Sequence, residues 1–246
     1  MNKLLLTAAI ALTVPLTAHA KTEFVEGDAT LAGEAELGAS LTTGNTDTSS
    51  FKASLALKQE LGDWENEYVF QGVYKRDDDE VTAKRFYTTL QGDYQIDGTS
   101  YIFANTSYET DPFTGYDFTS ITAAGYGHHF IDNETMSLSA EIGPGYIYQK
   151  LDSESAEAEG EDYDASAVAH FVINFETKVS DSATFQQTLI GDWGSKFDGR
   201  SETSLSTKII GDLSMKFAVV VRYNNKPLDE KKSTDTETNM TLLYAF

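Results

Sequence analysis

Apolar and polar residues alternate along most of this chain with a period of two, the spacing typical of β-strands whose two faces meet different surroundings. In the segment 51–61, Phe51 and Leu55 fall on one face and Lys58 on the other. Twelve such segments follow one another, and turn residues separate them. They lie near 33–43, 49–61, 64–76, 82–96, 99–110, 118–131, 135–150, 164–179, 183–197, 201–212, 215–225 and 235–246. The sequence therefore predicts an all-β protein.

The connections between these segments alternate between short turns, such as Asp97-Gly98, and longer polar loops. The longer set lies at 43–48, 77–80, 111–117, 152–163, 198–200 and 226–234. Short turns at one rim and long loops at the other are typical of outer-membrane barrels. We predict a 12-stranded antiparallel up-and-down transmembrane β-barrel over 33–246, with both ends of the barrel at the short-turn rim. A soluble sandwich is the alternative, and it does not explain the loop asymmetry.

One predicted strand contains a proline, which interrupts the regular strand pattern. Pro144 lies between two glycines in the segment 135–150 and cannot donate to a ladder, so we expect a bulge or bend there.

In lipid every backbone N–H and C=O needs a partner, so a spanning sheet must close on itself. We therefore expect the last strand to pair with the first. Its outward face would consist of Met240, Leu242, Tyr244 and Phe246. Such a strand resembles the signal read by the barrel assembly machinery, an expected partner.

The first twenty residues have the organisation of a secretory signal peptide. Lys3 precedes an apolar run over 4–16, which is too short for a transmembrane anchor, and Ala18-His19-Ala20 is a cleavage pattern. We predict cleavage after Ala20, leaving a short periplasmic segment at 21–32. The chain has no cysteine and, after the signal, no run of about 18 apolar residues. An exported chain of this kind is expected in the outer membrane and without disulfides.

The charge is strongly acidic, −21 from 18 basic and 39 acidic residues. This balance argues against nucleic acid as a partner, because phosphates require basic patches. The acidic loops at 77–80 and 152–162 lack the spacing of a calcium loop. A diffuse layer of divalent cations bridging to lipopolysaccharide remains open. We expect a monomer among outer-membrane lipids and lipopolysaccharide, with no cofactor.

The polar faces of the strands are expected to point into the barrel. Nine basic residues are assigned there: Lys52, Lys58, Lys75, Arg85, Lys178, Lys196, Lys208, Lys216 and Arg222. Eight acidic residues accompany them: Glu60, Glu65, Glu67, Asp93, Glu141, Glu176, Asp192 and Glu202. The interior is therefore expected to be nearly balanced in charge, and opposite charges in a narrow lumen can pair across it.

Catalytic chemistry has little support in the sequence. The mature chain carries His128, His129 and His170. Ser120 lies on the same predicted strand as His129, and Ser139 lies on the next one. No spacing selects a nucleophile, and no third orienting group stands out. We interpret the histidines as rim or lumen residues and do not expect an enzyme.

Two stretches carry a family resemblance, "LTTGNTDTSSF" at 41–51 and "SYETDPFTGYDFTSITAAGYGHHF" at 107–130. With them the chain, from about Gly33 to Phe246, resembles the YdiY-like salt-induced outer membrane proteins, a family defined by a domain of unknown function. The resemblance implies an outer-membrane barrel and implies no catalytic or binding residues.

Two main functions remain open. The first is a narrow, porin-like channel for small solutes or ions, with selectivity set by the inward charges. The second is a structural barrel of the envelope-stress or salt response, with a charge-plugged lumen and no transport. A lipid-modifying enzyme of the outer membrane is the third and least favoured hypothesis.

The predicted signal can be tested by export. Mass spectrometry of the exported protein should place its N-terminus at Lys21. Replacing Ala18 by Arg should block cleavage, because signal peptidase requires small residues at this position. An uncleaved wild-type chain in the envelope would contradict the prediction.

Overall fold

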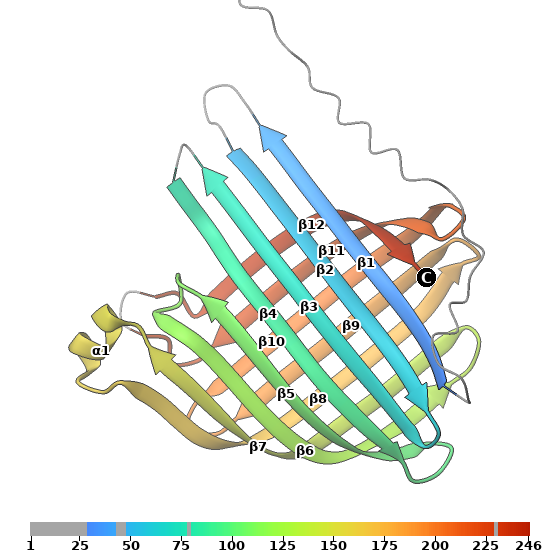
Figure 1. Ribbon diagram of the computed structural model, residues 1–246, viewed down its shortest axis with the longest axis horizontal. Coiled ribbons are helices and arrows are strands. Elements are labelled where there is room, and N and C mark those ends of the chain that lie inside the picture. The colour runs from blue at the N-terminus through green and yellow to red at the C-terminus, as the bar shows by residue number, and fades with distance from the viewer. Residues whose placement is uncertain (1–28, 43–47, 78–79, 229–230) are drawn as a thin grey trace, which may run out of the picture.

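The computed structural model describes residues 29–42, 48–77, 80–228 and 231–246, and within them the chain forms twelve strands and one short helix. The strands are β1 (Ala29–Thr42), β2 (Thr48–Leu61), β3 (Trp64–Asp77), β4 (Glu80–Gln95), β5 (Ser100–Asp111), β6 (Tyr116–Asp132), β7 (Met136–Leu151), β8 (Tyr163–Ser180), β9 (Ala183–Trp193), β10 (Phe197–Ile210), β11 (Leu213–Asn224) and β12 (Thr234–Ala245). The helix, α1 (Ser153–Glu159), lies between β7 and β8. Each strand pairs with its neighbours in the chain, and β12 returns to β1 (Figure 1). The predicted 12-stranded antiparallel barrel is confirmed.

The barrel closes through a short seam between β1 and β12. Four residue pairs join these strands, from Glu34 with Ala245 to Leu37 with Leu242. Gly33 and Phe246 also exchange two backbone hydrogen bonds of 2.8 Å each. A Cβ atom on Gly33 would lie 2.6 Å from Cε2 of the Phe246 ring, so the glycine makes room for the aromatic side chain. The expected pairing of the last strand with the first is confirmed.

The two faces of the wall are inverted relative to a soluble protein. Large apolar side chains such as Ile142 and Trp193 are 63% and 70% exposed on the outer face. Charged side chains such as Lys52 and Asp192 are only 5% and 4% exposed on the inner face. The ambiguous segment 99–110 follows this rule, because Tyr101 and Phe103 are buried inside the barrel while Ile102 lies outside. Outward apolar residues and inward polar ones are the arrangement of a membrane-spanning barrel.

The strand boundaries differ most from the predicted ones at β9, at β10 and at the start of β1. The residues 198–200, predicted as a loop, are paired in β10 with Asp192, Gly191 and Ile190 of β9. The connection is instead the turn at 194–196, where Gly194 N–H donates to the Lys196 carbonyl oxygen at 2.9 Å. Asp198-Gly199 resembles a turn in sequence, but the ladder with β9 decides its conformation. β1 begins at Ala29, earlier than the predicted start at 33.

The helix α1 was not predicted, because seven residues are too few for a recognisable helical period. Its ends explain why it forms. The Asp152 carboxylate accepts a hydrogen bond from the Ser155 N–H at 2.7 Å, and this bond lowers the pKa of Asp152. Gly160 ends the helix in the left-handed conformation, with φ 74°. Within the described residues, no helix is long and apolar enough to cross a membrane.

Several predictions fall partly or wholly outside the described residues. These are the signal cleavage at Ala18 and Ala20, most of the segment 21–32, the loop motif at 43–48, and parts of the acidic loop at 77–80 and of the loop at 226–234.

Two short turns share one capping geometry. The Asp97 carboxylate accepts hydrogen bonds from the Thr99 N–H and hydroxyl at 2.8 and 3.0 Å, which lower the pKa of Asp97. The Asn133 side-chain oxygen accepts the equivalent bonds from Thr135 at 3.1 and 2.9 Å. Side chains of this type stabilise tight turns by binding the backbone two residues on. Both short connections are thus built by the same local chemistry.

A bulge or bend was predicted at Pro144, and the bulge is wrong. Across it β6 and β7 keep one register, from Ala123 opposite Gly145 to Tyr126 opposite Ile142, so no residue is inserted. The strands instead approach each other closely. A Cβ atom on Gly125 would meet the carbonyl oxygen of Ile142 and lie 2.6 Å from Cα of Gly143.

This close approach gives a testable prediction. Gly125→Ala should lower the free energy of unfolding in detergent by about 1–3 kcal/mol, because the added methyl group must displace backbone atoms. Gly72→Ala is the control, since nothing lies within 4 Å of the added Cβ. The control should be neutral or slightly stabilising, by up to about 1 kcal/mol. Urea unfolding followed by tryptophan fluorescence measures both. Equal effects of the two substitutions would contradict the packing argument.

Candidate functional site

The candidate site is the interior of the barrel, which contains a cavity of about 640 Å³. Its lining begins at the long-loop end, with Asn224 and Leu228, and reaches Glu67 and Ser137 near the short-turn ends of their strands. Polar side chains dominate the strand faces that line it. One cavity therefore extends from the long-loop end of the barrel toward its short-turn end.

The seventeen lumen residues predicted from the sequence occupy inward strand faces or, for Lys196, the turn after β9. Six of them line the cavity: Glu67, Glu176, Asp192, Glu202, Lys216 and Arg222. Four others are buried: Lys52, Arg85, Glu141 and Lys196. The remaining seven lie on the same strand faces, toward the strand ends: Lys58, Glu60, Glu65, Lys75, Asp93, Lys178 and Lys208.

Lys231 and Lys232 of the last long loop line the cavity and were missed, and so were six ionisable residues on the strands. They are Glu34, Glu36, Glu109, Asp198, Arg200 and Glu237, each of which lines the cavity or pairs with a residue that does. Asp198 and Arg200 were assigned to a loop, and Glu109 lay on the ambiguous strand. Glu34, Glu36 and Glu237 belong to the two seam strands, where the polar face was not assigned. Together with the seventeen predicted residues, these eight give the assigned interior twelve basic and thirteen acidic side chains.

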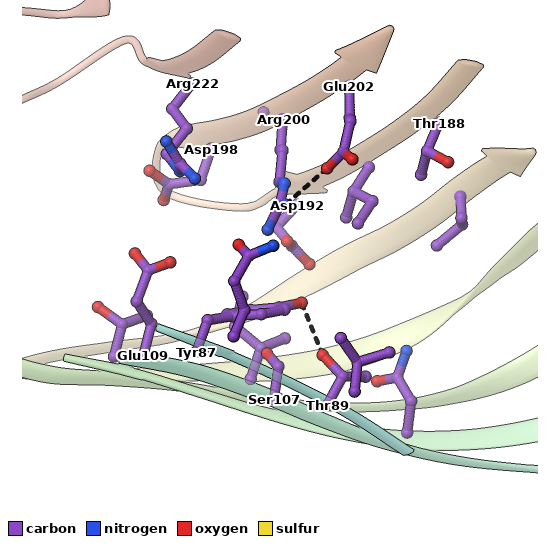
Figure 2. A pocket seen from close by; sticks show the side chains of 18 of the residues that line it. Tyr87, Thr89, Ser107, Glu109, Thr188, Asp192, Asp198, Arg200, Glu202 and Arg222 are labelled. Carbon is purple, nitrogen blue, oxygen red and sulfur yellow. Dashed lines mark hydrogen bonds and ion pairs between the residues drawn. The ribbon is translucent and has the colours of Figure 1, made fainter. Parts of the chain in front are cut away.

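The two walls of the barrel meet at Tyr87 and Arg200. Tyr87 is on β4 and Arg200 on β10, strands on opposite sides of the twelve-membered ring. The guanidinium carbon of Arg200 lies 5.1 Å from the centroid of the Tyr87 ring. This distance is within the range of a cation–π interaction. Figure 2 shows the Arg200 side chain extending from the upper wall toward Tyr87 on the lower one. We call this contact the pinch.

An ion-pair network surrounds the pinch. Arg85 Nη2 donates to Glu237 at 2.6 Å, a contact between β4 and β12 across the lumen, and Arg222 Nη1 donates to the same oxygen at 3.4 Å. Arg200 Nη2 donates to Glu202 at 2.9 Å (Figure 2). These pairs hold charged groups that would otherwise be costly to bury.

A second network supports the seam from inside. Glu36 on β1 accepts a hydrogen bond from Lys216 on β11 at 2.6 Å and another from the Thr241 hydroxyl on β12 at 3.3 Å. Lys52 on β2 lies 3.7 Å from the same carboxylate. One buried carboxylate therefore contacts the three strands nearest to β1, on both sides of the closure.

A third cluster lies on β4, β5 and β7. The Tyr101 hydroxyl and the Gln91 amide each donate to Glu141 at 2.9 Å, and Gln91 also donates to Asp93 at 3.0 Å. This cluster is rich in carboxylates and contains no arginine. The described residues include no group of three or more His, Cys, Asp or Glu side chains placed to hold a metal ion.

The histidines have partners other than the serines considered from the sequence. His170 Nδ1 lies 2.8 Å from Asp192 inside the barrel, a pairing that the sequence did not suggest. His128 Nδ1 lies 3.2 Å from the Ser100 hydroxyl, and the His129 ring packs 5.1 Å from the Tyr101 ring. Ser139 is opposite His129 in the β6–β7 ladder, and Ser120 is opposite Tyr148.

Solved structures with a similar outline include an outer membrane channel from Pseudomonas putida F1 and the KdgM porin. The first is 10% identical with a TM-score of 0.49, covering 88% of this chain and 95% of that one. The second is 11% identical with a TM-score of 0.43, covering 88% and 99%. With identities this low and TM-scores below 0.5, neither assigns a solute or a mechanism to this chain.

Comparison of sequences identifies the family of the chain. The uncharacterized protein YdiY of Escherichia coli (strain K12) is 26% identical over 168 residues, which is 68% of this chain. The aligned part spans 64% of the length of YdiY. Residues 35–246, nearly the whole barrel, match the family described as protein of unknown function, DUF481. The chain therefore belongs to the DUF481 family, as the YdiY-like resemblance of its motifs indicated.

Proposed function

We propose that this protein is a narrow outer-membrane channel for small charged solutes or ions. The observation that carries the proposal is one continuous cavity whose lining runs from Leu228 at the long-loop end to Ser137 near the short-turn end. A polar passage inside an apolar wall is what a solute needs to cross lipid. The general porins are wider, with 16–18 strands around an open aqueous channel. Twelve strands would restrict passage to small solutes.

The pinch would set the narrowest passage. Arg200 and Tyr87 approach from opposite walls, and the charged groups beside them, Glu202 and Arg222, line the same cavity. A permeating solute would therefore pass these side chains at close range. Rings of fixed charge are a common basis of selectivity in membrane pores.

A second candidate function is favoured by the contacts that cross the lumen. The Arg85–Glu237 pair and the pinch join opposite parts of the wall. If these contacts persist in the membrane, the barrel is closed and its role is structural, in the response of the envelope to salt or other stress. Deletion would then change salt or detergent tolerance without changing solute uptake. A lipid-modifying activity has no comparable support.

The same proposal includes the location of the barrel and its orientation in the membrane. The protein would be a monomer in the outer membrane, inserted by the barrel assembly machinery after removal of its signal. Its short turns would face the periplasm and its long acidic loops would face outward, near lipopolysaccharide. Divalent cations between these loops and lipid phosphates are part of the proposal.

Planar-bilayer recording tests the channel. Purified protein should give discrete conductance steps. Tyr87→Ala should increase the size of each step, because it removes the aromatic wall of the pinch. Tyr108→Ala, on the outward face of the neighbouring strand, is the matched control and should leave the step unchanged.

Silence of both the wild type and Tyr87→Ala in repeated, folded preparations would contradict the channel and favour the structural barrel. Heat-modifiable migration on gels, typical of closed barrels, confirms that each preparation is folded.

A further inference from the structure

Three arginines on separate strands gather around the pinch: Arg85 on β4, Arg200 on β10 and Arg222 on β11. We call them the arginine cluster. Their side chains are 7%, 17% and 20% exposed. Arg200 and Arg222 line the cavity directly, and Figure 2 shows both reaching from the same wall into it. Gathering three guanidinium groups in one narrow section is unfavourable unless acceptors compensate them.

Two carboxylates beside the arginine cluster, Glu237 and Glu202, already accept hydrogen bonds from side chains of the barrel. Glu237 accepts from Arg85 and Arg222 through one oxygen and from Asn239, at 2.7 Å, through the other. Glu202 accepts from Arg200 at 2.9 Å and lies 3.6 Å from Lys216. Glu237 and Glu202 are therefore occupied, and no arginine of the cluster donates a hydrogen bond to Glu109 or Asp198, two other carboxylates of this part of the cavity.

Donors, in contrast, are left over. The Nε atom of Arg85 and the Nε and Nη2 atoms of Arg222 are buried and have no hydrogen-bond partner in the described part of the chain. Arg85 Nε is 4.0 Å from the Glu109 carboxylate, which is too long for a hydrogen bond. A buried charged donor without an acceptor is costly. The section around the pinch thus has a surplus of guanidinium donors that point to a missing anion.

We infer that the arginine cluster is a binding site for a carboxylate-bearing solute. The Nε–Nη2 edge of a guanidinium is the fork that binds both oxygens of a carboxylate at once. On Arg222 both atoms of this edge are unpaired and buried, so the side chain, which lines the cavity, would turn this edge toward the bound carboxylate. Arg85 and Arg222 both pair with Glu237, so a carboxylate bound to Arg222 would also lie near Arg85. It could also compete with Tyr87 for Arg200, which would loosen the pinch as the solute passes.

The net charge of the chain does not oppose this site. The excess acid includes the loops and the carboxylate cluster around Glu141 and Asp93, on the short-turn side of their strands. The arginine cluster lies toward the long-loop ends of β4, β10 and β11. A carboxylate entering from the long-loop side would therefore meet arginines before the acidic cluster. The inference deepens the proposed channel and rests on it for its physiological meaning, but binding is measurable without conduction.

Isothermal titration calorimetry of the folded, full-length protein in detergent tests the inference, with succinate as the probe. The wild type should bind succinate saturably and should not bind succinamide, its neutral diamide of the same size. Arg222→Gln should weaken binding by at least about tenfold, because it removes the charge and the fork together. Arg222→Lys keeps the charge but loses the fork, so its affinity for succinate should lie between those of the wild type and Arg222→Gln.

Lys58→Gln is the matched control, because it removes one positive charge from the inward face of β2, where Lys58 pairs with Glu65 at 2.7 Å. It should bind succinate as the wild type does. Absence of saturable binding by the folded wild type would overturn the inference, and so would equal losses in Lys58→Gln and Arg222→Gln. Conductance without succinate binding would overturn this inference and leave the channel standing. Succinate binding without conductance would support the site and contradict the channel.

Discussion

The structure depends on one requirement, that no strand edge is left open in lipid. A backbone N–H or C=O without a partner in hydrocarbon costs several kcal/mol, so a spanning sheet is stable only when its last strand pairs with its first. Here that junction consists of four residue pairs and the two hydrogen bonds between Gly33 and Phe246. The β1–β2 hairpin pairs along its whole length, and the junction is much shorter. Side chains must therefore contribute to closure.

Glu36 provides part of that contribution. It connects Lys216, Lys52 and Thr241 across the junction from inside the barrel, where Glu36 itself is only 7% exposed. On the outside, the Phe246 ring covers the space that Gly33 leaves free. Closure thus joins an apolar contact that faces lipid to an ionic contact that faces the lumen. The same division into an apolar exterior and a charged interior extends around the barrel, and it places the arginine cluster and the cavity in one compartment.

The sequence predicted the fold well and the interior in part. The alternation in segments such as 51–61 is a local signal, so it placed Lys52 and Lys58 on the inward face correctly. The prediction failed where a local signal was ambiguous. Asp198-Gly199 resembles a hairpin turn, and its place in the ladder depends on the pairing with β9. Pro144 suggested a bulge, but Gly125 and Gly143 allow the strands to approach without one. The error at 198–200 left Arg200, one of the two residues of the pinch, out of the predicted lumen.

What the sequence determined by itself is the kind of wall, namely the number of strands, their antiparallel order and the inward face of most of them. These follow from period-two alternation and from turn residues, which act between near neighbours in the chain. Only the tertiary structure decided which side chains meet across the lumen. Arg85 and Glu237 are 152 residues apart, and Arg200 reaches Tyr87 from the opposite wall. Such contacts depend on strand tilt and stagger around the closed ring, which no local pattern encodes.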